Sequence, residues 1–576
     1  MSLARRRWVP PALVAAAALV LAGLTPAATA DAAPTGWLVR PMCATPRAGH
    51  ASCHGLKLVR GRLVQGVTAV RRPSGLGGPM GGYSPHRLAK AYGLRPNAAV
   101  GAHQTVAIVD AYRDPSVRAD LAAFDRHYHL PKETASSFRV VNQHGHTAPL
   151  PRADEGWAGE IGLDVQAVRG ICHKCRILLV EANNDSDGAL AAAVNTAARL
   201  GADEISNSYG GTEDDPYNTR SVVAAYDHPG VVITASTGDA GWYDWDYLNA
   251  DYPPSNTPEI PAAYKTVVGV GGTSLYVDSS GRRLGEHAWN GDGPADQDGR
   301  VVRQPLGAGG GGCSTLYRAP LWQAKTAGYR GLGCGARRSS VDVAAVADPA
   351  TGYDVYQSYP SSIGSWATVG GTSLSAPLIA AMWALAGGAG GVRYPALSLY
   401  GHFAHRSLRR VHDVTVGGTG LCGSASLTEC RTAWGPNPNV TAGGLVDCAF
   451  PAHGTTVLAN RYQCYARRGY DGVAGVGTPA GTSIFKPMTP TARITRPGRV
   501  RLGARVRYSA ARSGDPFPGG RIVRYVWHWG DGHVTHTTHR AAAHRYHSTG
   551  RHTVTLTVVD NYGRRDSGSR RLSVHG

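Results

Sequence analysis

The residues that could do chemistry include two serines at the start of an apolar run. GGTSLSAP, residues 370–377, continues as LIAAMWALAG, which predicts a buried helix that begins near these serines. A helix N-terminus offers free backbone N–H groups and a favourable dipole, so Ser373 fits a nucleophile there. Ser375 would face another side of the helix. Serine is also a common helix cap, which is the structural alternative for Ser373.

A serine hydroxyl needs a base, and histidine is the usual one. HGHT, residues 144–147, is followed by APLP, so its histidines cannot open a helix. Asp110, in IVDAY, could orient a catalytic histidine only if the next helix carried one. The next helical pattern, EGWAGEIGLDVQAVRGI at residues 155–171, carries carboxylates instead.

Three carboxylates are candidates for the missing acid–base chemistry. Glu160 and Asp164 are four residues apart, so both lie on one face of the predicted helix. Like charges near the end of a buried strand would raise the pKa of one carboxyl group and let it exchange a proton, unless both acids are simply solvated. Asp239, in STGDAG, could donate a hydrogen bond to an oxyanion if acid or burial keeps it protonated. Otherwise it is an ordinary turn residue.

Alternating strands and helices must position these side chains. Strand-like runs at residues 104–112, 176–182, 204–210 and 231–239 alternate with helical patterns such as 187–201. This order predicts an α/β fold, a parallel sheet flanked by helices. After residue 486, ARVRYSA, IVRYVWHWGDG and HTVTLTVVD alternate with period two, which predicts a small antiparallel β-sandwich. The Pro-rich stretch KPMTPTARITRPG marks the boundary.

The N-terminus is typical of an exported protein. Residues 1–30 combine three arginines at positions 5–7, a short apolar core at 14–25 and a small-residue cleavage site at 28–30. We therefore expect a secretory signal peptide and an extracellular protein, with an uncleaved anchor as the alternative. No later stretch is long and apolar enough to span a bilayer.

Ten cysteines fit an oxidising compartment, where disulfides are stable. CHKC at residues 172–175 could alternatively be a redox motif. Proximity alone predicts five disulfides: Cys43/Cys53, Cys172/Cys175, Cys313/Cys334, Cys422/Cys430 and Cys448/Cys464.

The positive charge is concentrated at the C-terminal end. The whole chain has a formal net charge of +19, and residues 488–576 hold 16 Arg against 4 Asp, with no Lys or Glu, which gives 16 − 4 = +12. A basic surface favours anionic partners such as cell-wall polymers or polysaccharides. A solvated sheet surface that keeps the protein soluble is the alternative. We expect no nucleic-acid partner, and we expect a monomer.

Several motifs together resemble one known family. YSPHRLAKAYGL with QTVAIVDAY, GEIGLD, STGDAG, YKTVVGVGGTSL, DVAAVADPATGY and GGTSLSAP occur in that order between residues 83 and 486. The set resembles the sedolisins, which are serine-carboxyl peptidases with a subtilisin-like fold. The resemblance implies that Ser373 is the nucleophile, Glu160 the general base, Asp164 its orienting partner and Asp239 the oxyanion-hole residue.

The same resemblance implies one structural calcium ion near the end of the peptidase domain. HDVTVGG and ARRGYDGVAG stand where the family has Asp-Ile-Thr and Ala-Gly-Pro-Gly-Trp-Asp. Asp413 and Asp471 would supply carboxylates, and Val414, Arg467 and Gly469 would supply backbone carbonyls, an oxygen set that suits Ca²⁺. Two arginines replace Gly-Pro here, which backbone ligation tolerates if their side chains point outward.

Both ends of the chain differ from the core of the family. Sedolisins usually carry a large folded prosegment, whereas residues 31–82 here are only 52 in number. This piece could be a short prosegment or an N-terminal extension, and Cys43 and Cys53 could belong to either. Residues 487–576 resemble a PKD domain, an immunoglobulin-like sandwich, on YVWHWGDG and HRYHSTGRHTVTLTVVD. Trp527 and Trp529 are expected in its core.

The resemblance implies a secreted endopeptidase that acts through an acyl-enzyme on proteins or peptides, at acidic pH. A tripeptidyl aminopeptidase of the same family is the alternative within enzymes. From another class, the chain could be a surface-binding protein with an inactive peptidase domain. A lipase or esterase is disfavoured because no Gly-x-Ser-x-Gly elbow with a following Asp and His is present.

Overall fold

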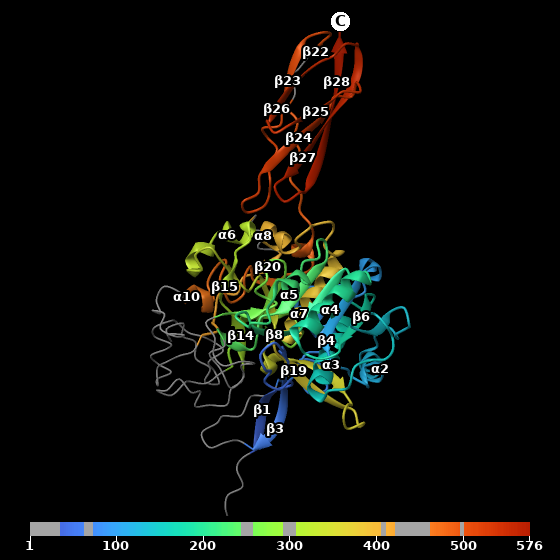
Figure 1. The fold of residues 1–576 in the computed structure, drawn as a ribbon, viewed down its shortest axis with the longest axis vertical. Helices are drawn as coiled ribbons and strands as arrows, with labels where there is room; N and C mark the ends of the chain where they lie inside the picture. Colours follow the sequence, from blue (N-terminus) through green and yellow to red (C-terminus); the bar gives the residue numbers. More distant parts are fainter. Residues whose placement is uncertain are drawn as a thin grey trace, which may run out of the picture.

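The computed structural model describes residues 35–62, 73–243, 257–291, 307–404, 410–420, 461–495 and 500–576. An α/β body holds most of these residues, and a β-sandwich stands at one end of it (Figure 1). The predicted signal peptide and the cysteines at positions 422, 430 and 448 lie outside the described residues.

A mostly parallel sheet forms the centre of the α/β body. Its strand order is β13-β12-β9-β7-β4-β6-β5, with β17 also paired to β12, and only β13 runs antiparallel. The predicted parallel sheet is therefore confirmed. Its strands are β4 (Thr105–Ala111), β5 (Phe138–Asn142), β6 (Arg176–Ala182), β7 (Glu204–Asn207), β9 (Val232–Ser236), β12 (Val268–Val277), β13 (Arg283–Ala288) and β17 (Val343–Val346).

Helices cover both faces of this sheet because its strands are apolar on both sides. Val106 and Ile108 of β4 pack in one core cluster with residues of α3, and Ala107 and Val109 pack in a second cluster with residues of α4. The first face carries α2 (Val117–Tyr128), α3 (Glu155–Ile171) and α7 (Thr372–Ala386), and the second carries α4 (Asp187–Arg199) and α5 (Arg220–Ala224).

The N-terminal residues are part of the α/β body, although their sequence shows little periodicity. β1 (Thr35–Pro41) and β3 (Leu56–Arg62) form an antiparallel hairpin, which projects from the body opposite the sandwich (Figure 1). β3 continues into a sheet with β19 (Ser365–Gly370) and β18 (Tyr353–Gln357). Between the hairpin strands, β2 (Ser52–Cys53) joins β8 (Tyr209–Thr212) and β11 (Glu259–Ile260).

The C-terminal residues form the predicted antiparallel sandwich. Trp527 and Trp529 are fully buried, as expected, and stack with ring centroids 5.5 Å apart. Tyr562 and Phe517 pack against each other, and Tyr562 contacts Trp322 of the α/β body. The strands are β22 (Val500–Arg501), β23 (Arg505–Ser509), β24 (Ile522–His528), β25 (Val534–Thr537), β26 (Ala541–Arg545), β27 (Gly550–Asp560) and β28 (Arg565–His575).

In the described residues, no helix is long and apolar enough to cross a membrane.

Short elements connect the layers described above. The remaining elements are α1 (Pro85–Ala91), η1 (Ala99–His103), β10 (Ala240–Trp242), β14 (Ala308–Gly311), β15 (Cys313–Arg318), α6 (Leu321–Ala324), η2 (Tyr329–Leu332), β16 (Arg337–Ser339), η3 (Pro349–Thr351), α8 (Ala396–Ala404), β20 (Val411–His412), α10 (Arg461–Cys464), β21 (Thr478–Pro479) and η7 (Ser483–Phe485).

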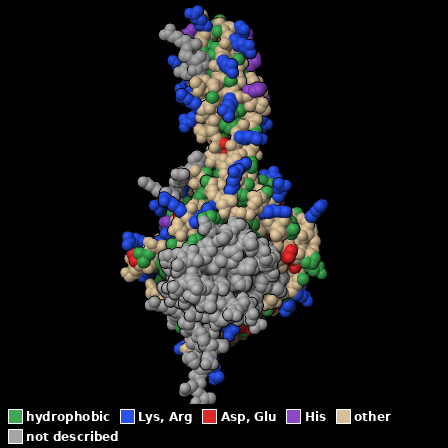
Figure 2. All heavy atoms as spheres, turned by 90° about the vertical axis from the view of Figure 1, so that its left-hand side faces the viewer, with side chains coloured by type: hydrophobic (Ala, Val, Ile, Leu, Met, Phe, Trp, Pro, Cys, Tyr) green, Lys and Arg blue, Asp and Glu red, His purple; other side chains and the backbone are tan. Residues whose placement is uncertain are grey.

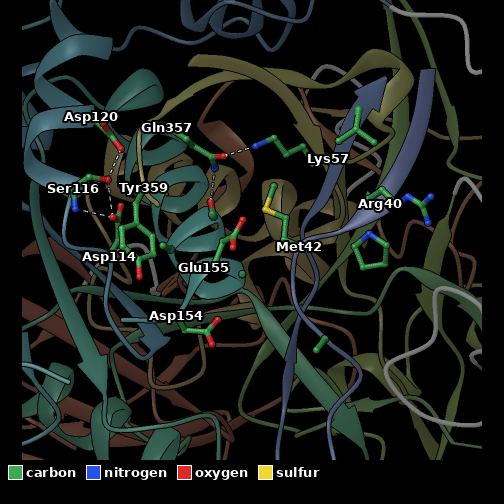
Figure 3. A pocket seen from close by; sticks show the side chains of 16 residues that line it. Arg40, Met42, Lys57, Asp114, Ser116, Asp120, Asp154, Glu155, Gln357 and Tyr359 are labelled. Atoms are coloured by element: carbon green, nitrogen blue, oxygen red, sulfur yellow. Dashed lines mark hydrogen bonds between the residues drawn. The ribbon is translucent and has the colours of Figure 1, made fainter. Parts of the chain in front are cut away.

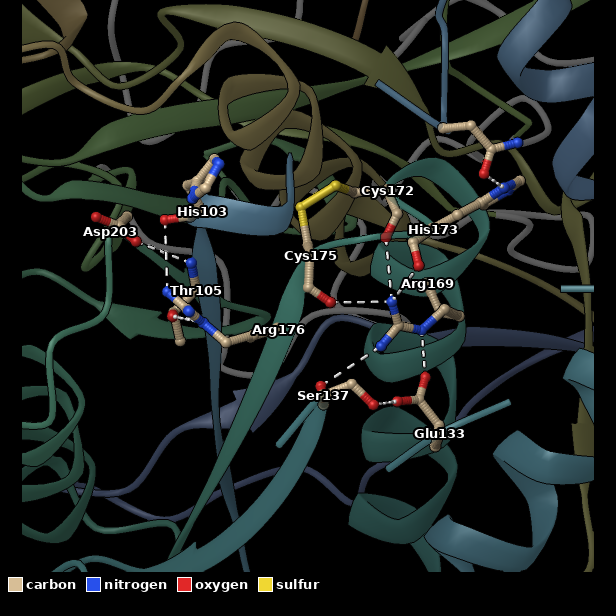
Figure 4. Close-up of a disulfide and its surroundings, with 11 residues drawn as sticks. His103, Thr105, Glu133, Ser137, Arg169, Cys172, His173, Cys175, Arg176 and Asp203 are labelled. Atoms are coloured by element: carbon tan, nitrogen blue, oxygen red, sulfur yellow. Dashed lines mark hydrogen bonds and ion pairs between the residues drawn. A yellow bond between two sulfur atoms is a disulfide. The ribbon is translucent and has the colours of Figure 1, made fainter. Parts of the chain in front are cut away.

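Three of the predicted disulfides are present, Cys43–Cys53, Cys172–Cys175 and Cys313–Cys334. Cys172 and Cys175 are fully buried in the turn between α3 and β6. The buried Arg169 guanidinium donates to the carbonyl oxygens of both cysteines and pairs with Glu133 (Figure 4). This enclosed bond fits a structural role better than a redox motif, which needs an accessible thiolate.

Candidate active site

Ser373 lies in the first turn of α7, directly after strand β19. Gly371 caps the helix with φ of 93°, a backbone conformation that favours glycine. The Ser373 hydroxyl donates to the Ser208 carbonyl oxygen at 3.2 Å, and the side chain is fully buried. Ser375 points elsewhere, as predicted, and donates to the carbonyl oxygen of Ala345.

Glu160, in the middle of α3, lies beside this serine, and Asp164 follows one helical turn later. Both are fully buried, so the alternative of two solvated acids is wrong. The Ser208 hydroxyl donates to Asp164 Oδ1 at 2.9 Å and lies 3.2 Å from the Ser373 carbonyl oxygen. Burial is the largest cause that raises the pKa of Glu160 well above its usual range, and the charge of Asp110 adds to it, whereas the Ser373 hydroxyl lowers it.

Asp110 is a third buried carboxyl group beside this pair. It stands near the C-terminal end of β4 with no exposed surface, and burial raises its pKa to about 8. Its charge also raises the pKa of Asp164. The sequence placed Asp110 at a strand end but gave it no role without a histidine. Three carboxyls this close cannot all ionise, so the group retains protons at neutral pH.

Asp239 follows β9 and turns toward the start of α7. Its Oδ1 accepts hydrogen bonds from the Thr372 backbone N–H at 2.7 Å and from the Thr372 hydroxyl at 2.8 Å. A Cβ atom placed on Gly371 would lie 2.4 Å from Asp239 Oδ2. Because Gly371 has no side chain, the second oxygen of Asp239 can face the space beside the Ser373 backbone N–H.

One residue at this site was missed entirely by the sequence interpretation. The Ser373 backbone N–H donates to the carbonyl oxygen of His54 at 3.2 Å. A Cβ atom on the next residue, Gly55, would lie 2.2 Å from Glu160 Oε2. The N-terminal segment therefore crosses directly over the candidate catalytic residues. Nothing in its Gly- and Arg-rich sequence signals this contact.

A pocket of about 540 Å³ opens beside this crossing (Figure 3). Lys57 of β3 donates to Gln357 Oε1 at 3.0 Å, and Gln357 in turn donates to the Gly159 carbonyl oxygen of α3 at 2.9 Å. The N-terminal segment and α3 together line the pocket. Acidic side chains line the α2–α3 side: Asp114, Asp120, Asp154 and Glu155.

The residues predicted to bind calcium are brought together in the structure. Asp413 accepts from the Gly469 backbone N–H at 3.0 Å, and Asp471 accepts from the Arg467 backbone N–H at 2.9 Å. Burial raises the pKa of Asp471 to about 7, and the charge of Asp413 adds to it. A cation between them would relieve this repulsion. Val414 is buried beside Asp413.

Two arginines lie beside this site: the charge of Arg468 acts on Asp413, whose pKa it lowers, and would oppose a cation there, whereas Arg467 is engaged elsewhere. The Arg467 guanidinium donates to the carbonyl oxygens of Tyr470 at 3.1 Å and Gly328 at 2.7 Å, and it stacks on Tyr462. Its charge is thereby directed away from the carboxylates. The donor set is all oxygen, so the residues fit a Ca²⁺ ion, which these five residues would hold.

Among the described residues, one other group could hold a metal, on the β-sandwich. Asp531, His533 and His544 offer ligand atoms that lie within 4.8 Å of one another. Asp531 already accepts a hydrogen bond from His544 at 2.6 Å, and His533 is largely exposed. These contacts account for the cluster without an ion.

Known proteins match both parts of the chain. Residues 144–389 match the subtilase family, and residues 487–574 match the PKD domain. Kumamolisin from Bacillus sp. (strain MN-32) is 30% identical over 369 residues, which cover 62% of this chain and 60% of kumamolisin. Sedolisin from Pseudomonas sp. (strain 101) is 28% identical over 374 residues, which cover 62% of this chain and 59% of sedolisin.

The chain is similar to sedolisin-family peptidases over its α/β part and matches the PKD domain at its C-terminal end. The predicted resemblance to the sedolisins is thus confirmed. A solved structure of Pseudomonas sedolisin, a serine-carboxyl proteinase complexed with two molecules of pseudo-iodotyrostatin, covers 70% of this chain and 96% of its own, with TM-score 0.53 and 24% identity. It supports the subtilisin-like fold. The chain spans about three fifths of the length of the two curated relatives.

Proposed function

We propose that this sedolisin-like protein is a secreted endopeptidase in which Ser373, Glu160, Asp164 and Asp239 hydrolyse peptide bonds. The proposal is carried by the meeting of Ser373, at a helix N-terminus, with the buried carboxyl group of Glu160 and, one helical turn away, that of Asp164. The Ser373 hydroxyl is weak as a nucleophile until a neighbouring base takes its proton. In this proposal Glu160 takes that proton, and Asp164 orients Glu160.

The reaction starts when Ser373 Oγ adds to a peptide carbonyl carbon and Glu160 accepts the hydroxyl proton. The negative charge that develops on the carbonyl oxygen is stabilised by hydrogen bonds from the Ser373 backbone N–H and from a protonated Asp239. Glu160 then gives its proton to the leaving nitrogen, and water releases the acyl group by the same steps in reverse. A bound Ca²⁺ ion would stabilise the loop around Asp413 and takes no part in these steps.

Acidic conditions favour this mechanism. Asp239 can donate to an oxyanion only when it carries a proton, so activity is lost as that proton leaves. Burial and mutual repulsion raise the pKa of Glu160, Asp164 and Asp110. The three carboxyl groups therefore titrate as one coupled group that stays partly protonated. We therefore expect a bell-shaped dependence of kcat/KM on pH with its maximum on the acid side of neutral.

The path of the N-terminal segment favours an endopeptidase over a tripeptidyl aminopeptidase. The segment continues on both sides of Ser373, as β2 on one side and β3 on the other. On the side that a tripeptidyl aminopeptidase would close after three residues, the segment continues beyond Ser52, and the Ala51 backbone N–H donates to the Asp185 carbonyl oxygen at 2.8 Å. A chain that extends in both directions from Ser373 fits an endopeptidase.

Secretion is supported by the three disulfides, which form in oxidising compartments. The PKD domain would bring the enzyme to an anionic polymer surface, since it carries the excess of arginine. Figure 2 shows the Arg side chains spread over the visible face of this domain rather than gathered at one point. That distribution suits a weak, non-specific attachment.

Replacement of Ser373 by alanine tests the peptidase proposal. Full-length protein is assayed on a denatured protein substrate from pH 3 to 8. We expect Ser373→Ala to lower kcat by at least ~10⁴-fold, because the nucleophile is lost. Ser375→Ala is the matched control and should retain most activity. An active Ser373→Ala variant, or no cleavage by the unmodified protein with calcium present, would contradict the proposal.

A further inference from the structure

The segment around His54 lies against the catalytic residues in the manner of a peptide substrate. β2 pairs antiparallel with β8, so that Ser52 lies opposite Gly210 and Cys53 opposite Tyr209. The His54 backbone N–H continues this ladder by donating to the Ser208 carbonyl oxygen at 3.2 Å. An extended peptide added to a strand edge is a common mode of peptide binding.

The His54–Gly55 peptide bond is the bond that faces the nucleophile. The His54 carbonyl oxygen accepts from the Ser373 backbone N–H, and a Cβ atom on Gly371 would lie 2.0 Å from it. The same imaginary atom would lie 2.4 Å from Asp239 Oδ2, so the carbonyl oxygen occupies the place where an oxyanion would form. Gly55 lies against Glu160 on the other side of the bond.

The His54 side chain fills a buried acidic pocket. Its Nε2 lies 2.6 Å from Glu259 Oε2, and its Nδ1 is hydrogen-bonded to Ser236 Oγ at 2.7 Å. The side chains of His54 and Glu259 are 1% and 2% exposed, so each polar group depends on the other. Gly210 makes room for the pair, because a Cβ atom there would lie 2.2 Å from Glu259 Oε2.

The segment is fixed on both sides of this bond. The Cys43–Cys53 disulfide ties the residue before His54 to the end of the hairpin, and the Met42 backbone N–H donates to the Gly55 carbonyl oxygen at 2.8 Å. On the other side, β3 pairs with β19, with Leu56 opposite Gly370. The backbone contacts hold any sequence, whereas the Glu259 pocket discriminates among side chains.

We propose that Glu259 selects substrates with histidine immediately before the cleaved bond, and that residues 50–57 are the protein's own substrate of this kind. The proposal rests on the peptidase function proposed above. Until this segment is cut, it covers Ser373 and keeps other peptides out. A buried carboxylate that loses its histidine partner is costly, so a leucine in the same place is bound less well.

Cleavage of the segment follows the chemistry of the site. Ser373 Oγ adds to the His54 carbonyl carbon as Glu160 takes its proton. The C–N bond to Gly55 breaks when that proton passes to the leaving nitrogen. Water then adds to the acyl carbon, which restores the Ser373 hydroxyl and leaves a carboxyl group on His54 and an amino group on Gly55.

Selection is tested with two peptides that differ only at the residue before the bond. SAHGLK and SALGLK, in which the natural Cys53 is alanine, flank the bond with the residues of the segment. Full-length protein is incubated at acid pH and then assayed for kcat/KM on both. We expect the histidine peptide to be preferred at least tenfold, and Glu259→Gln to remove this preference through a loss of kcat/KM on the histidine peptide with no loss on the leucine peptide.

One further variant keeps the test independent of folding. Glu259→Asp should restore part of the preference, because it keeps the carboxylate. Equal loss on both peptides in Glu259→Gln would indicate a merely structural role and overturn the proposal, as would equal cleavage of the two peptides by the unmodified protein. Ser373-dependent cleavage of other substrates would show in that case that the peptidase function itself stands.

The register is tested on the protein itself by mass spectrometry after acid incubation. We expect a new N-terminus at Gly55 in the unmodified protein and none in Ser373→Ala. A cut at another bond between residues 50 and 57, or no cut under conditions that fully hydrolyse the histidine peptide, would overturn the placement of His54.

Discussion

At the scale of single residues, Asp110 is the neighbour that most directly affects the proposed base. A charge on Asp110 competes with a charge on Glu160 or Asp164 and raises the pKa of both, so the three carboxyl groups share their protons. Asp110→Asn keeps the shape and removes the charge. The pKa of Glu160 should therefore fall, and the acid limb of kcat/KM should move to lower pH by roughly one unit.

Glu204 offers a matched control for this measurement. It is another fully buried carboxyl group of the same sheet with a raised pKa, but it lies at the start of β7 and its charged neighbour is Asp203. Glu204→Gln should leave the acid limb in place. An unchanged limb in Asp110→Asn, with both variants folded to the same Tm, would show that Asp110 does not act on the base.

The sequence was sufficient to predict those candidate catalytic residues whose positions follow from helix spacing and motif order. Glu160 and Asp164 share a face because they are four residues apart, and in the structure Glu160 contacts Ser373 while Asp164 accepts from the Ser208 hydroxyl. The contact of Ser373 with His54 was out of reach, because it joins residues more than 300 positions apart. A backbone hydrogen bond of this kind leaves no trace in side-chain spacing.

At the scale of elements, the loop that follows α10 decides whether calcium stabilises the peptidase domain. Asp413 and Asp471 both bind its backbone N–H groups, and their charges repel. Chelation with EGTA should therefore lower the free energy of unfolding by about 2.7 kcal/mol if calcium was present at 100 times its Kd. The fall in Tm, roughly 5 °C, is measured by calorimetry.

Two variants identify the origin of this response. Asp413→Asn removes one carboxylate ligand and should abolish the difference between calcium and EGTA. Asp531→Asn, in the cluster on the β-sandwich, should preserve it. The opposite pattern would place the ion in the PKD domain and contradict the site at Asp413.

Elements with a clear hydrophobic periodicity could be predicted from the sequence, whereas elements without one could not. The helical pattern at residues 155–171 and the strand at 176–182 match α3 and β6 to the residue. The hairpin of β1 and β3 went unnoticed because its sequence, TGWLVRP and LKLVRGR, is short and rich in arginine and glycine. Its pairing with β19 supplies the stability that its own sequence lacks.

At the scale of the whole molecule, the chain combines a basic surface with an unusual number of buried acids. The PKD domain carries most of the positive charge, whereas the parallel sheet encloses carboxyl groups that burial keeps protonated. Burial raises the pKa of Asp110 and Glu181 to about 8 and that of Asp125 to about 7. These buried acids stabilise the folded protein at acid pH, and Glu181 and Asp125 do so outside the catalytic site.

The buried acids predict that stability falls as pH rises. In the unfolded chain these groups lose their protons near pH 4, whereas in the folded protein they keep them to about pH 7 or 8. The folded state thus binds more protons in this window. Each such group lowers the free energy of unfolding by about 1.4 kcal/mol per pH unit between its unfolded and folded pKa.

We therefore expect Tm to be highest near pH 4 to 5 and to fall steadily to pH 8. Calorimetry of Ser373→Ala in saturating calcium avoids self-cleavage and keeps the calcium site filled. Added salt at about 0.5 M screens the repulsion among surface arginines and protonated histidines, which would otherwise oppose the trend at low pH. Glu181→Gln removes one titrating group and should make the slope shallower. A Tm that stays level or rises from pH 5 to 8 would mean that these carboxyl groups are ionised in the folded protein, with waters or cations compensating their burial.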